Sequence, residues 1–171
     1  ALEPVYDMFD LASPEDALFP STTWSTMSVS CSGGGDGHAS LLPTFDFHHV
    51  DAVSLGASGD LVVSSRTLNT VWALRHDGSG PRWALSSSLN ASRFAYPFLA
   101  FARDADKFYA PHAAIVAASG DLLVVDDGDS RPGCTTAVAA GCFSRVVRYA
   151  LDAGAGTAAV AWQFEWGVDL A

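Results

Sequence analysis

Two stretches of the chain repeat one pattern of apolar and polar positions. Residues 57–63 read Ala-Ser-Gly-Asp-Leu-Val-Val, and residues 118–124 read Ala-Ser-Gly-Asp-Leu-Leu-Val. A glycine turn followed at once by a short apolar run is typical of a hairpin that joins two strands. The offset from residue 57 to residue 118 is 61 positions, a period that leaves room for four short strands in each unit.

The same order of features continues after each hairpin. Each unit has a second apolar run, then a glycine-rich turn, then a strand that carries a tryptophan. The paired features are the runs at 71–74 and 146–151, the turns at 77–80 and 152–156, and the tryptophans Trp83 and Trp162. We expect Trp72, Trp83 and Trp162 to be core residues. The pattern predicts an all-β fold with two four-stranded β-propeller blades, and a β-sandwich with a chance repeat is the competing interpretation.

The other segments divide the chain around these blades. The expected units are an irregular segment, insertion or partial blade at 1–45, a first blade at 46–86, a connection at 87–109, a second blade at 110–166 and the start of a next element at 167–171. Two blades cannot close a ring and leave open strand edges, so we expect the chain to be part of a longer protein.

Aromatic residues are concentrated in and beside the connection. They are expected to pack this segment against the core, and the alternative is a wall beside an aromatic substrate. The residues are Phe94, Tyr96, Phe98, Phe101, Phe108 and Tyr109.

Composition and charge argue against several classes of function. Hydrophobic residues make up 49% of the 171 residues and charged residues 16%, which is typical of a globular protein. A net charge of −10 with only nine Lys and Arg argues against a nucleic-acid partner. No apolar run reaches the roughly 18 residues of a membrane span, and residues 1–10 lack the basic region of a signal peptide. Residues 126–129 fit a strand-end turn better than a calcium loop, so neither a metal ion nor a cofactor is expected.

Cysteine spacing points to an oxidising compartment. Cys134 and Cys142 bracket a loop of small residues, which suits a local disulfide. Cys31 is then left over, with a partner that is not evident from this sequence. Residues 90–92 read Asn-Ala-Ser, a glycosylation sequon that matters only in a secreted protein. Together these features predict a secreted, periplasmic or lumenal location.

Two histidines and an arginine are the candidate chemical groups. Residues 47–53 are predicted to form a strand with His49 and Asp51 on one face and His48 on the other. The next strand ends in Arg66, which the hairpin should return to His49. His112 is expected to take the corresponding first-strand place in the second unit. First strands line the channel of a propeller, so these groups are expected to meet in one small cavity, where Arg and His suit a tetrahedral oxyanion.

At these residues the chain resembles the arylsulfotransferases that work without a nucleotide sulfate donor. Five blocks carry the resemblance, in the same order as in the family and over roughly residues 45–166. They are Asp-Phe-His-His-Val-Asp-Ala-Val at 46–53, Gly-Asp-Leu-Val-Val-Ser-Ser-Arg at 59–66, Pro-His at 111–112, Val-Asp-Asp-Gly-Asp-Ser-Arg at 125–131 and Phe-Ser-Arg-Val-Val-Arg-Tyr at 143–149.

The resemblance implies a six-bladed propeller and a ping-pong transfer from an aryl sulfate donor to a phenolic acceptor. His112 matches the nucleophile that carries the sulfuryl group as a sulfohistidine. His49 and Arg66 match residues that bind the sulfuryl oxygens and help the bridging oxygen to leave. The candidate substrate-binding residues are Asp51, Asp127, Arg131 and Arg145, of which the two arginines fit a role in bracing their loop better.

Three departures from the family pattern bear on activity. Asp51 and Asp127 stand where the family has asparagine, and an ionised carboxylate repels sulfate where an amide can donate to it. Asp51 would therefore have to be protonated, paired with Arg66 or turned away. Pro111 replaces a glutamine and removes a donor. The alternatives are a non-catalytic propeller that binds a protein or glycan, and a different propeller enzyme, such as a metal-dependent hydrolase or lyase.

Overall fold

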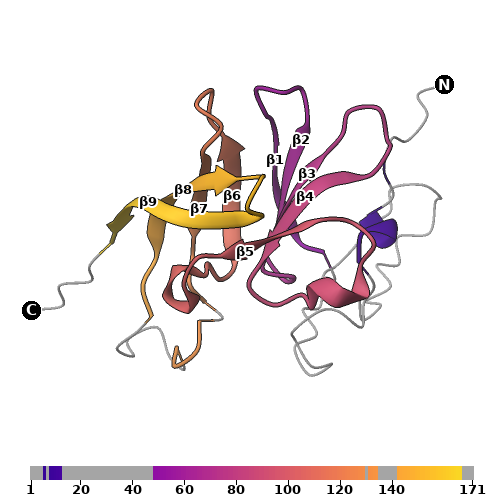
Figure 1. Ribbon diagram of the computed structural model, residues 1–171. Coiled ribbons are helices and arrows are strands. Elements are labelled where there is room, and N and C mark those ends of the chain that lie inside the picture. The colour runs from indigo at the N-terminus through magenta and orange to yellow at the C-terminus, as the bar shows by residue number, and fades with distance from the viewer. Residues whose placement is uncertain (1–5, 7, 13–47, 130, 135–141, 167–171) are drawn as a thin grey trace, which may run out of the picture.

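The fold consists of two antiparallel four-stranded meanders that stand side by side (Figure 1). We analysed a computed structural model, which describes residues 6, 8–12, 48–129, 131–134 and 142–166. The first meander comprises β1 (Val50–Leu55), β2 (Leu61–Ser65), β3 (Thr70–Leu74) and β4 (Pro81–Ser86). The second comprises β6 (Pro111–Val116), β7 (Leu122–Asp126), β8 (Arg145–Asp152) and β9 (Thr157–Glu165). The all-β prediction is confirmed, and the two meanders have the form of two propeller blades.

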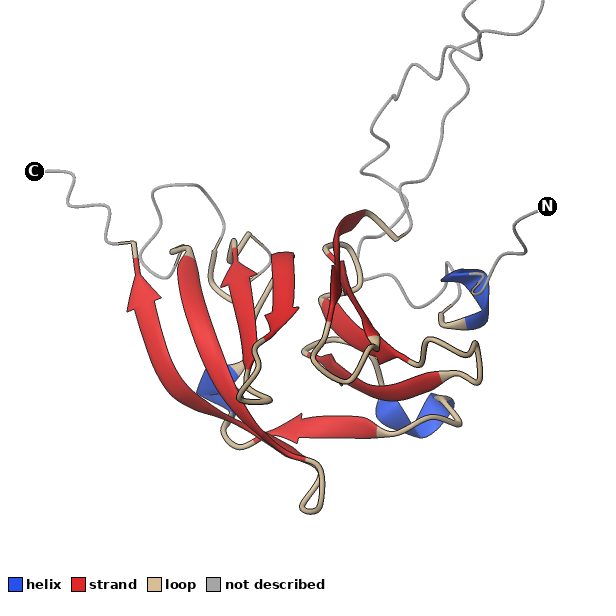
Figure 2. Cartoon of the chain, turned by 90° about the horizontal axis from the view of Figure 1, so that it is seen from above, coloured by secondary structure: helices blue, strands red, loops and turns tan. Residues whose placement is uncertain are grey.

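A ninth strand joins the outer edges of the blades, and the sequence did not predict it. β5 (Phe98–Phe101) pairs in parallel with β4 through residues 98–99 and with β9 through residues 100–101. The sheet order is therefore β1-β2-β3-β4-β5-β9-β8-β7-β6, and Figure 2 shows β5 crossing from one blade to the other. Three short 3-10 helices, η1 (Met8–Asp10), η3 (Ala91–Arg93) and η4 (Asp104–Asp106), complete the described elements.

The repeated hairpins have the same hydrogen bonds at an offset of 61 residues. Gly56 N–H donates to Asp60 C=O at 2.8 Å, and Ala117 N–H donates to Asp121 C=O at 2.9 Å. Gly59 and Gly120 both have positive φ, 82° and 89°, which a side-chain-bearing residue adopts only with strain. The predicted hairpins are thus confirmed, and the offset identifies equivalent positions in the two blades.

Both first strands begin with the same irregularity, which corrects two predictions. The pairing shifts between Val50 and Ala52 in β1, and between Pro111 and Ala113 in β6. Asp51 and His112 are therefore the equivalent residues, and the expected equivalence of His112 with His49 is wrong. The predicted strand over 47–53 and its simple alternation are also wrong for the described part. β1 starts only at Val50, after His49 in a left-handed conformation with φ of 35°, because the extra residue breaks the two-residue period.

The main core lies between the blades, and a second one covers the far face of the first blade. Alternate residues of the first blade, such as Val62 and Val63, enter different clusters. The inter-blade cluster comprises Val62, Val71, Leu85, Leu99, Phe108, Ala114, Leu122, Val124, Val147, Tyr149 and Ala158. The second cluster comprises Leu11, Ala12, Val63, Leu68, Trp72, Leu74 and Ala84.

The tryptophans and the connection aromatics distribute unequally over these cores. Trp72 is fully buried and Trp83 packs against the inter-blade cluster, but Trp162 is 49% exposed. The core prediction is wrong for Trp162 because β9 extends past the part that the first blade covers. The aromatics of the connection pack on the cores as expected: Tyr96 and Phe98 stack at 5.2 Å in the second cluster, and Phe108 lies in the main core.

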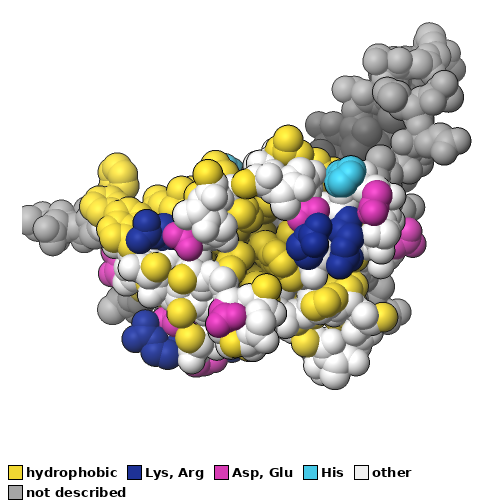
Figure 3. All heavy atoms as spheres, turned by 45° about the horizontal axis from the view of Figure 1, so that its top comes forward, with side chains coloured by type: hydrophobic (Ala, Val, Ile, Leu, Met, Phe, Trp, Pro, Cys, Tyr) yellow, Lys and Arg dark blue, Asp and Glu magenta, His cyan; other side chains and the backbone are white. Residues whose placement is uncertain are grey.

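The blades diverge at the end that carries the Ser-Gly-Asp turns. Figure 3 shows hydrophobic side chains in the hollow between them, with basic and acidic groups at its rim. A small cavity of about 70 Å³ lies here and is lined by Val62, Trp83, Val116 and Leu151 among others. Asp60, which is almost completely buried, and its partner Arg82 also line it. No helix in the described part of the chain is long and apolar enough to cross a membrane.

Candidate functional site

The predicted site residues meet at the opposite end of the blades from the Ser-Gly-Asp turns. His49 and Asp51 lie at the start of β1, and Arg66 directly follows β2. Arg66 N–H donates to the carbonyl of His49 at 3.0 Å, so the hairpin returns Arg66 to His49 as expected. His112 comes from the start of β6, and Asp127 directly follows β7.

Asp51 lies between the two histidines. Its Oδ1 is 3.1 Å from Nε2 of His49, and its Oδ2 is 3.3 Å from Nδ1 of His112. The carboxylate is only 11% exposed, whereas the His112 side chain is 57% exposed. Asp51 is thus paired with imidazoles, which differs from the three options of protonation, an ion pair with Arg66 or an outward orientation. The His112 ring combines one nitrogen at a carboxylate with wide access for a small molecule.

Arg66 is held by two carboxylates of the second blade. Its Nη1 donates to Oδ2 of Asp127 at 3.0 Å, and its Nη2 donates to Oδ2 of Asp129. A guanidinium has five N–H donors. Two of the five are directed at these carboxylates, and the other three have no acceptor within the described part of the chain. Asp127 Oδ2 also lies 4.0 Å from Nδ1 of His112. The cluster therefore links both blades through alternating charges.

Equivalent positions of the two blades meet each other in this cluster. At the 61-residue offset Asp51 corresponds to His112, and Arg66 corresponds to Asp127. Each pair has an acid in one blade and a basic group in the other, and each pair is in contact. Equivalent positions of the two blades thus carry residues of opposite chemical character, and these residues lie in contact where the blades meet.

Burial makes Asp127 a weaker acid than an ordinary aspartate. Removal from solvent raises its pKa, and the nearby charges of Asp129 and Asp51 raise it further, while Arg66 and His112 oppose the shift. Asp127 is thus a weaker acid although Arg66 and His112 lie beside it, because burial outweighs their attraction.

Arg131 and Arg145 are directed at a different carboxylate. Nη2 of Arg131 and Nε of Arg145 donate to Oδ2 of Asp126, at 2.7 and 2.8 Å. Asp126 is fully buried, and its Oδ1 accepts the backbone N–H of Tyr109 at 2.8 Å. The Arg131 guanidinium also lies 4.0 Å from the ring centre of Phe143. These contacts brace the loop after β7, and a substrate-binding role for the two arginines stays a prediction.

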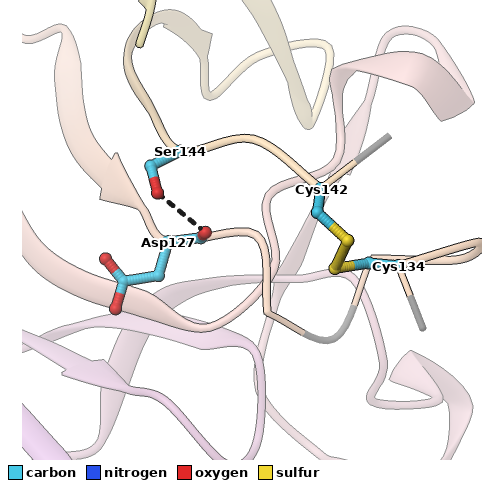
Figure 4. The surroundings of a disulfide bond; sticks show 4 residues. All are labelled: Asp127, Cys134, Cys142 and Ser144. Carbon is cyan, nitrogen blue, oxygen red and sulfur yellow. Dashed lines mark hydrogen bonds between the residues drawn. A yellow bond between two sulfur atoms is a disulfide. The ribbon is translucent and has the colours of Figure 1, made fainter. Parts of the chain in front are cut away.

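A disulfide closes the same loop beside the site. Cys134 and Cys142 are bonded, which confirms the predicted pairing, and Cys31 lies outside the described residues. Ser144 donates its hydroxyl to the carbonyl of Asp127 at 3.0 Å, and Figure 4 shows the Asp127 carboxylate pointing away from the disulfide. A cavity of about 410 Å³ on the loop side is lined by Asp127, Gly128, Asp129, Cys134, Cys142, Phe143, Ser144 and Trp166.

The clustered groups are not arranged as a metal centre in the part of the chain that the structure describes. No group of three or more His, Cys, Asp or Glu side chains there could hold a metal ion. What the geometry offers is an accessible imidazole, a second imidazole and a guanidinium within one small region. Such a set can provide a nucleophile and donors for an oxyanion.

A comparison with protein families places these residues in a known group. The family model described as Arylsulfotransferase (ASST) matches residues 5–168, which is nearly the whole chain. The chain belongs to the arylsulfotransferase family. No curated protein sequence matches it. The family membership agrees with the resemblance carried by the five sequence blocks, and it implies small-molecule aryl substrates for this arylsulfotransferase-family chain.

The sequence analysis did not predict the role of Asp129 in the cluster, nor that of Asp126 beside it. Asp129 was seen as part of a turn, although it holds Arg66, and Asp126 was not seen as the buried partner of two arginines. Both belong to the Asp-Asp-Gly-Asp run, in which the equivalent of Asp126 in the first blade is Ser65. One sequence signal could have predicted these ion pairs. It is an acidic residue at the end of an apolar strand, with two arginines in the next 20 residues.

Proposed function

We propose that this chain carries the transfer site of an aryl sulfotransferase. The enzyme takes a sulfuryl group from a phenolic sulfate ester and passes it to a phenol, with His112 as the covalent carrier. The observation that carries the proposal is the His112 imidazole: its Nδ1 faces Asp51 and Asp127, and its side chain is 57% exposed. Among the described residues Nε2 has no hydrogen-bond partner, so its lone pair can reach a substrate.

The reaction has two half-steps that share one nucleophile. The Nε2 lone pair of His112 attacks sulfur, an N–S bond forms, and the S–O bond to the aryl group breaks with its electron pair on the aryl oxygen. A protonated His49 supplies the proton that turns the leaving aryloxide into a phenol. In the second half-step the oxygen of the acceptor phenol attacks sulfur, His49 takes its proton, and the N–S electron pair returns to Nε2. This is ping-pong chemistry.

Arg66 supplies hydrogen-bond donors for this chemistry. Three guanidinium N–H groups remain beyond the two that Asp127 and Asp129 occupy. They can donate to the equatorial sulfuryl oxygens, where donors aimed at developing charge contribute about 10²–10³ in rate each. The bonded Cys134–Cys142 pair supports a secreted or periplasmic location, because such bonds persist in oxidising compartments.

The test uses the protein in its full natural length with a chromogenic aryl sulfate and a phenol acceptor. We expect phenol release, sulfation of the acceptor and an acid-labile adduct on His112 with the mass of one sulfuryl group. His112→Ala should lower the rate at least about 10³-fold and abolish the adduct. His76→Ala, which changes an exposed histidine in the β3–β4 turn, is the matched control and should be active. Full activity of His112→Ala would disprove the nucleophile assignment.

One observation favours a second candidate, a non-catalytic binding module. Arg66 is already neutralised by Asp127 and Asp129, and both histidines already face Asp51. In that case the cluster would serve to hold the blades together, and the protein would bind a protein or glycan elsewhere. A folded protein that gives neither phenol release nor adduct, with several aryl sulfates, would favour this second function.

A further inference from the structure

Asp51 is the acidic group closest to the proposed nucleophile. Its Oδ2 lies 3.3 Å from Nδ1 of His112, compared with 4.0 Å for Oδ2 of Asp127. That same Oδ2 is buried and has no hydrogen-bond partner among the described residues. Buried carboxylate oxygens are normally satisfied by a donor, and Nδ1 of His112, 3.3 Å away, can carry one. The two atoms are thus within hydrogen-bonding distance of each other.

We propose that Asp51 positions His112 for attack by accepting the Nδ1–H and so holding the imidazole lone pair at Nε2. A neutral imidazole has one N–H and one lone pair, and the partner of one nitrogen decides where each of them lies. A carboxylate at Nδ1 is the usual device for this choice in histidine-dependent enzymes. The inference rests on the proposed function, and it replaces the substrate-binding role that the family pattern implied for Asp51.

The same carboxylate also compensates the charge of the intermediate. When Nε2 forms the N–S bond and the aryl oxygen leaves with the S–O electron pair, the ring keeps its Nδ1–H and becomes positive. Asp51 then lies beside a cation in a largely buried position, where the attraction is stronger than in water. On transfer to the phenol the N–S pair returns to Nε2, and the Nδ1 proton stays in place throughout. Asp51 touches neither sulfur nor its oxygens, so it is a positioning residue.

The backbone places Asp51 there by a device present in both blades. The irregularity at the start of β1 turns Asp51 inward after His49, whose φ of 35° is left-handed. The same irregularity in β6 presents His112, so the two extra residues face each other. The Ser54 hydroxyl donates to the carbonyl of Ala114 at 2.8 Å and holds β1 against β6. The Asp51–His112 contact therefore depends on the backbone positions of β1 and β6.

The primary test reads the proton position directly. We would record the ¹⁵N spectrum of the imidazoles in the full natural-length protein at alkaline pH, where ordinary imidazoles are neutral. His112, assigned by its loss in His112→Ala, should be in the Nδ1–H form. In Asp51→Asn the Nε2–H form should appear, because an amide can also donate to Nδ1. An Nε2–H form in the unchanged protein, or no change in Asp51→Asn, would overturn the inference without bearing on whether His112 carries sulfate.

The kinetic test separates positioning from substrate binding. In Asp51→Ala, which removes the acceptor altogether, the single-turnover rate of phenol release should fall about 10²-fold, while KM for the aryl sulfate stays within about twofold. A raised KM with unchanged kcat would show that Asp51 binds substrate and would also overturn the inference. Asp121→Ala, at the turn between β6 and β7 with Arg148 as its partner, is the matched control and should have the activity of the unchanged protein. Failure of the proposed function itself would appear separately, as absence of the His112 adduct.

Discussion

The two blades have the same backbone frame but are covered differently. In the first blade β3 is buried along its whole length. One of its faces packs on the second blade, and the other packs on Tyr6, Met8, Leu11, Ala12 and the aromatic part of the connection. In the second blade β7 alternates buried and half-buried positions, because only its inner face is covered. Trp162, Phe164 and Trp166 are exposed beyond this cover. The comparison teaches that the burial pattern of a strand depends on which segments pack against it. The turns and the strand pairing depend on the residues of the hairpin itself.

The blades differ a second time in the side chains at equivalent strand ends. Ser65 ends β2, where its hydroxyl donates to the carbonyl of His48, and Asp126 ends β7, where it holds Arg131 and Arg145. The first blade needs only a short turn before β3. The second blade carries a long disulfide-closed loop before β8, and a buried ionic group ties that loop down. The second blade thus has a buried aspartate at this position because it has a longer loop to hold in place.

The largest expected effect comes from removing this buried acid. Asp126→Ala leaves the buried Arg145 guanidinium without its carboxylate, so the free energy of unfolding should fall by about 3–5 kcal/mol. The equivalent change in the first blade, Ser65→Ala, should cost only about 1 kcal/mol. Urea unfolding followed by tryptophan fluorescence measures both. Equal losses would mean that the Asp126 ion pairs do not brace the second blade.

The next largest effect concerns the glycine that begins the long loop. Gly128 has φ of 77°, and a Cβ there would lie 2.3 Å from the carbonyl oxygen of Phe143. Gly128→Ala should therefore destabilise the protein by about 2–4 kcal/mol through strain and overlap. Gly120→Ala, in the β6–β7 turn with φ of 89° and open space, is the control and should cost about 1 kcal/mol. Thermal unfolding of the two variants compares them, and an equally mild Gly128→Ala would contradict the close approach.

A charge exchange tests whether equivalent positions truly face each other. Arg66→Asp places a third carboxylate beside Asp127 and Asp129, and Asp127→Arg places a second cation beside Arg66. The double variant restores an opposite pair with its direction reversed. A double-mutant cycle should give a coupling energy of about 1 kcal/mol for this partly exposed pair. Transfer activity should stay low in the double variant, because the cation has moved to the other blade. Zero coupling would indicate that the contact does not form in solution.

The smallest expected effect is a pH dependence with opposite signs at two aspartates. The raised pKa of Asp127 means that the folded state binds its proton more tightly than the unfolded state. Its contribution is therefore most favourable at low pH and declines as pH rises from the unfolded to the folded pKa. Asp127→Asn should remove that decline, and the unfolding free energy of the variant should change less with pH on the acid side.

Asp60 supplies the opposite case in the first blade. The hydrogen bond from Arg82 lowers the pKa of Asp60, followed in size by burial, which opposes it. The stability that Asp60 contributes is present above its unfolded pKa and is lost as pH falls through the folded pKa. Asp60→Asn should therefore flatten the acid side of the stability profile. Unfolding free energies measured across this pH range should show slopes of opposite sign, and a shared sign would refute the assignment.

Much of the fold was predictable because it depends on neighbours along the chain. The Ser-Gly-Asp turns, the hairpins and the Cys134–Cys142 bond follow from local spacing and turn chemistry. β5 was not predictable, since its short apolar run has no hairpin partner and pairs with strands on either side of it in the chain. Trp162 was wrongly predicted to be buried, because the residue pattern of a strand does not show how far the neighbouring segments extend along it.

For the site, the amino-acid order proposed His49, Arg66 and His112 as candidates, and it predicted correctly that a hairpin returns Arg66 to His49. It could not show that Asp51 faces His112 or that Arg66 faces Asp127, because both contacts cross between blades. A one-residue irregularity reverses which face a side chain occupies, and it leaves no clear mark in a string of alternating residues. Contacts between the two blades depend on how their hairpins pack against each other. That packing is decided by the core that forms between the blades, and not by the residues of either hairpin alone.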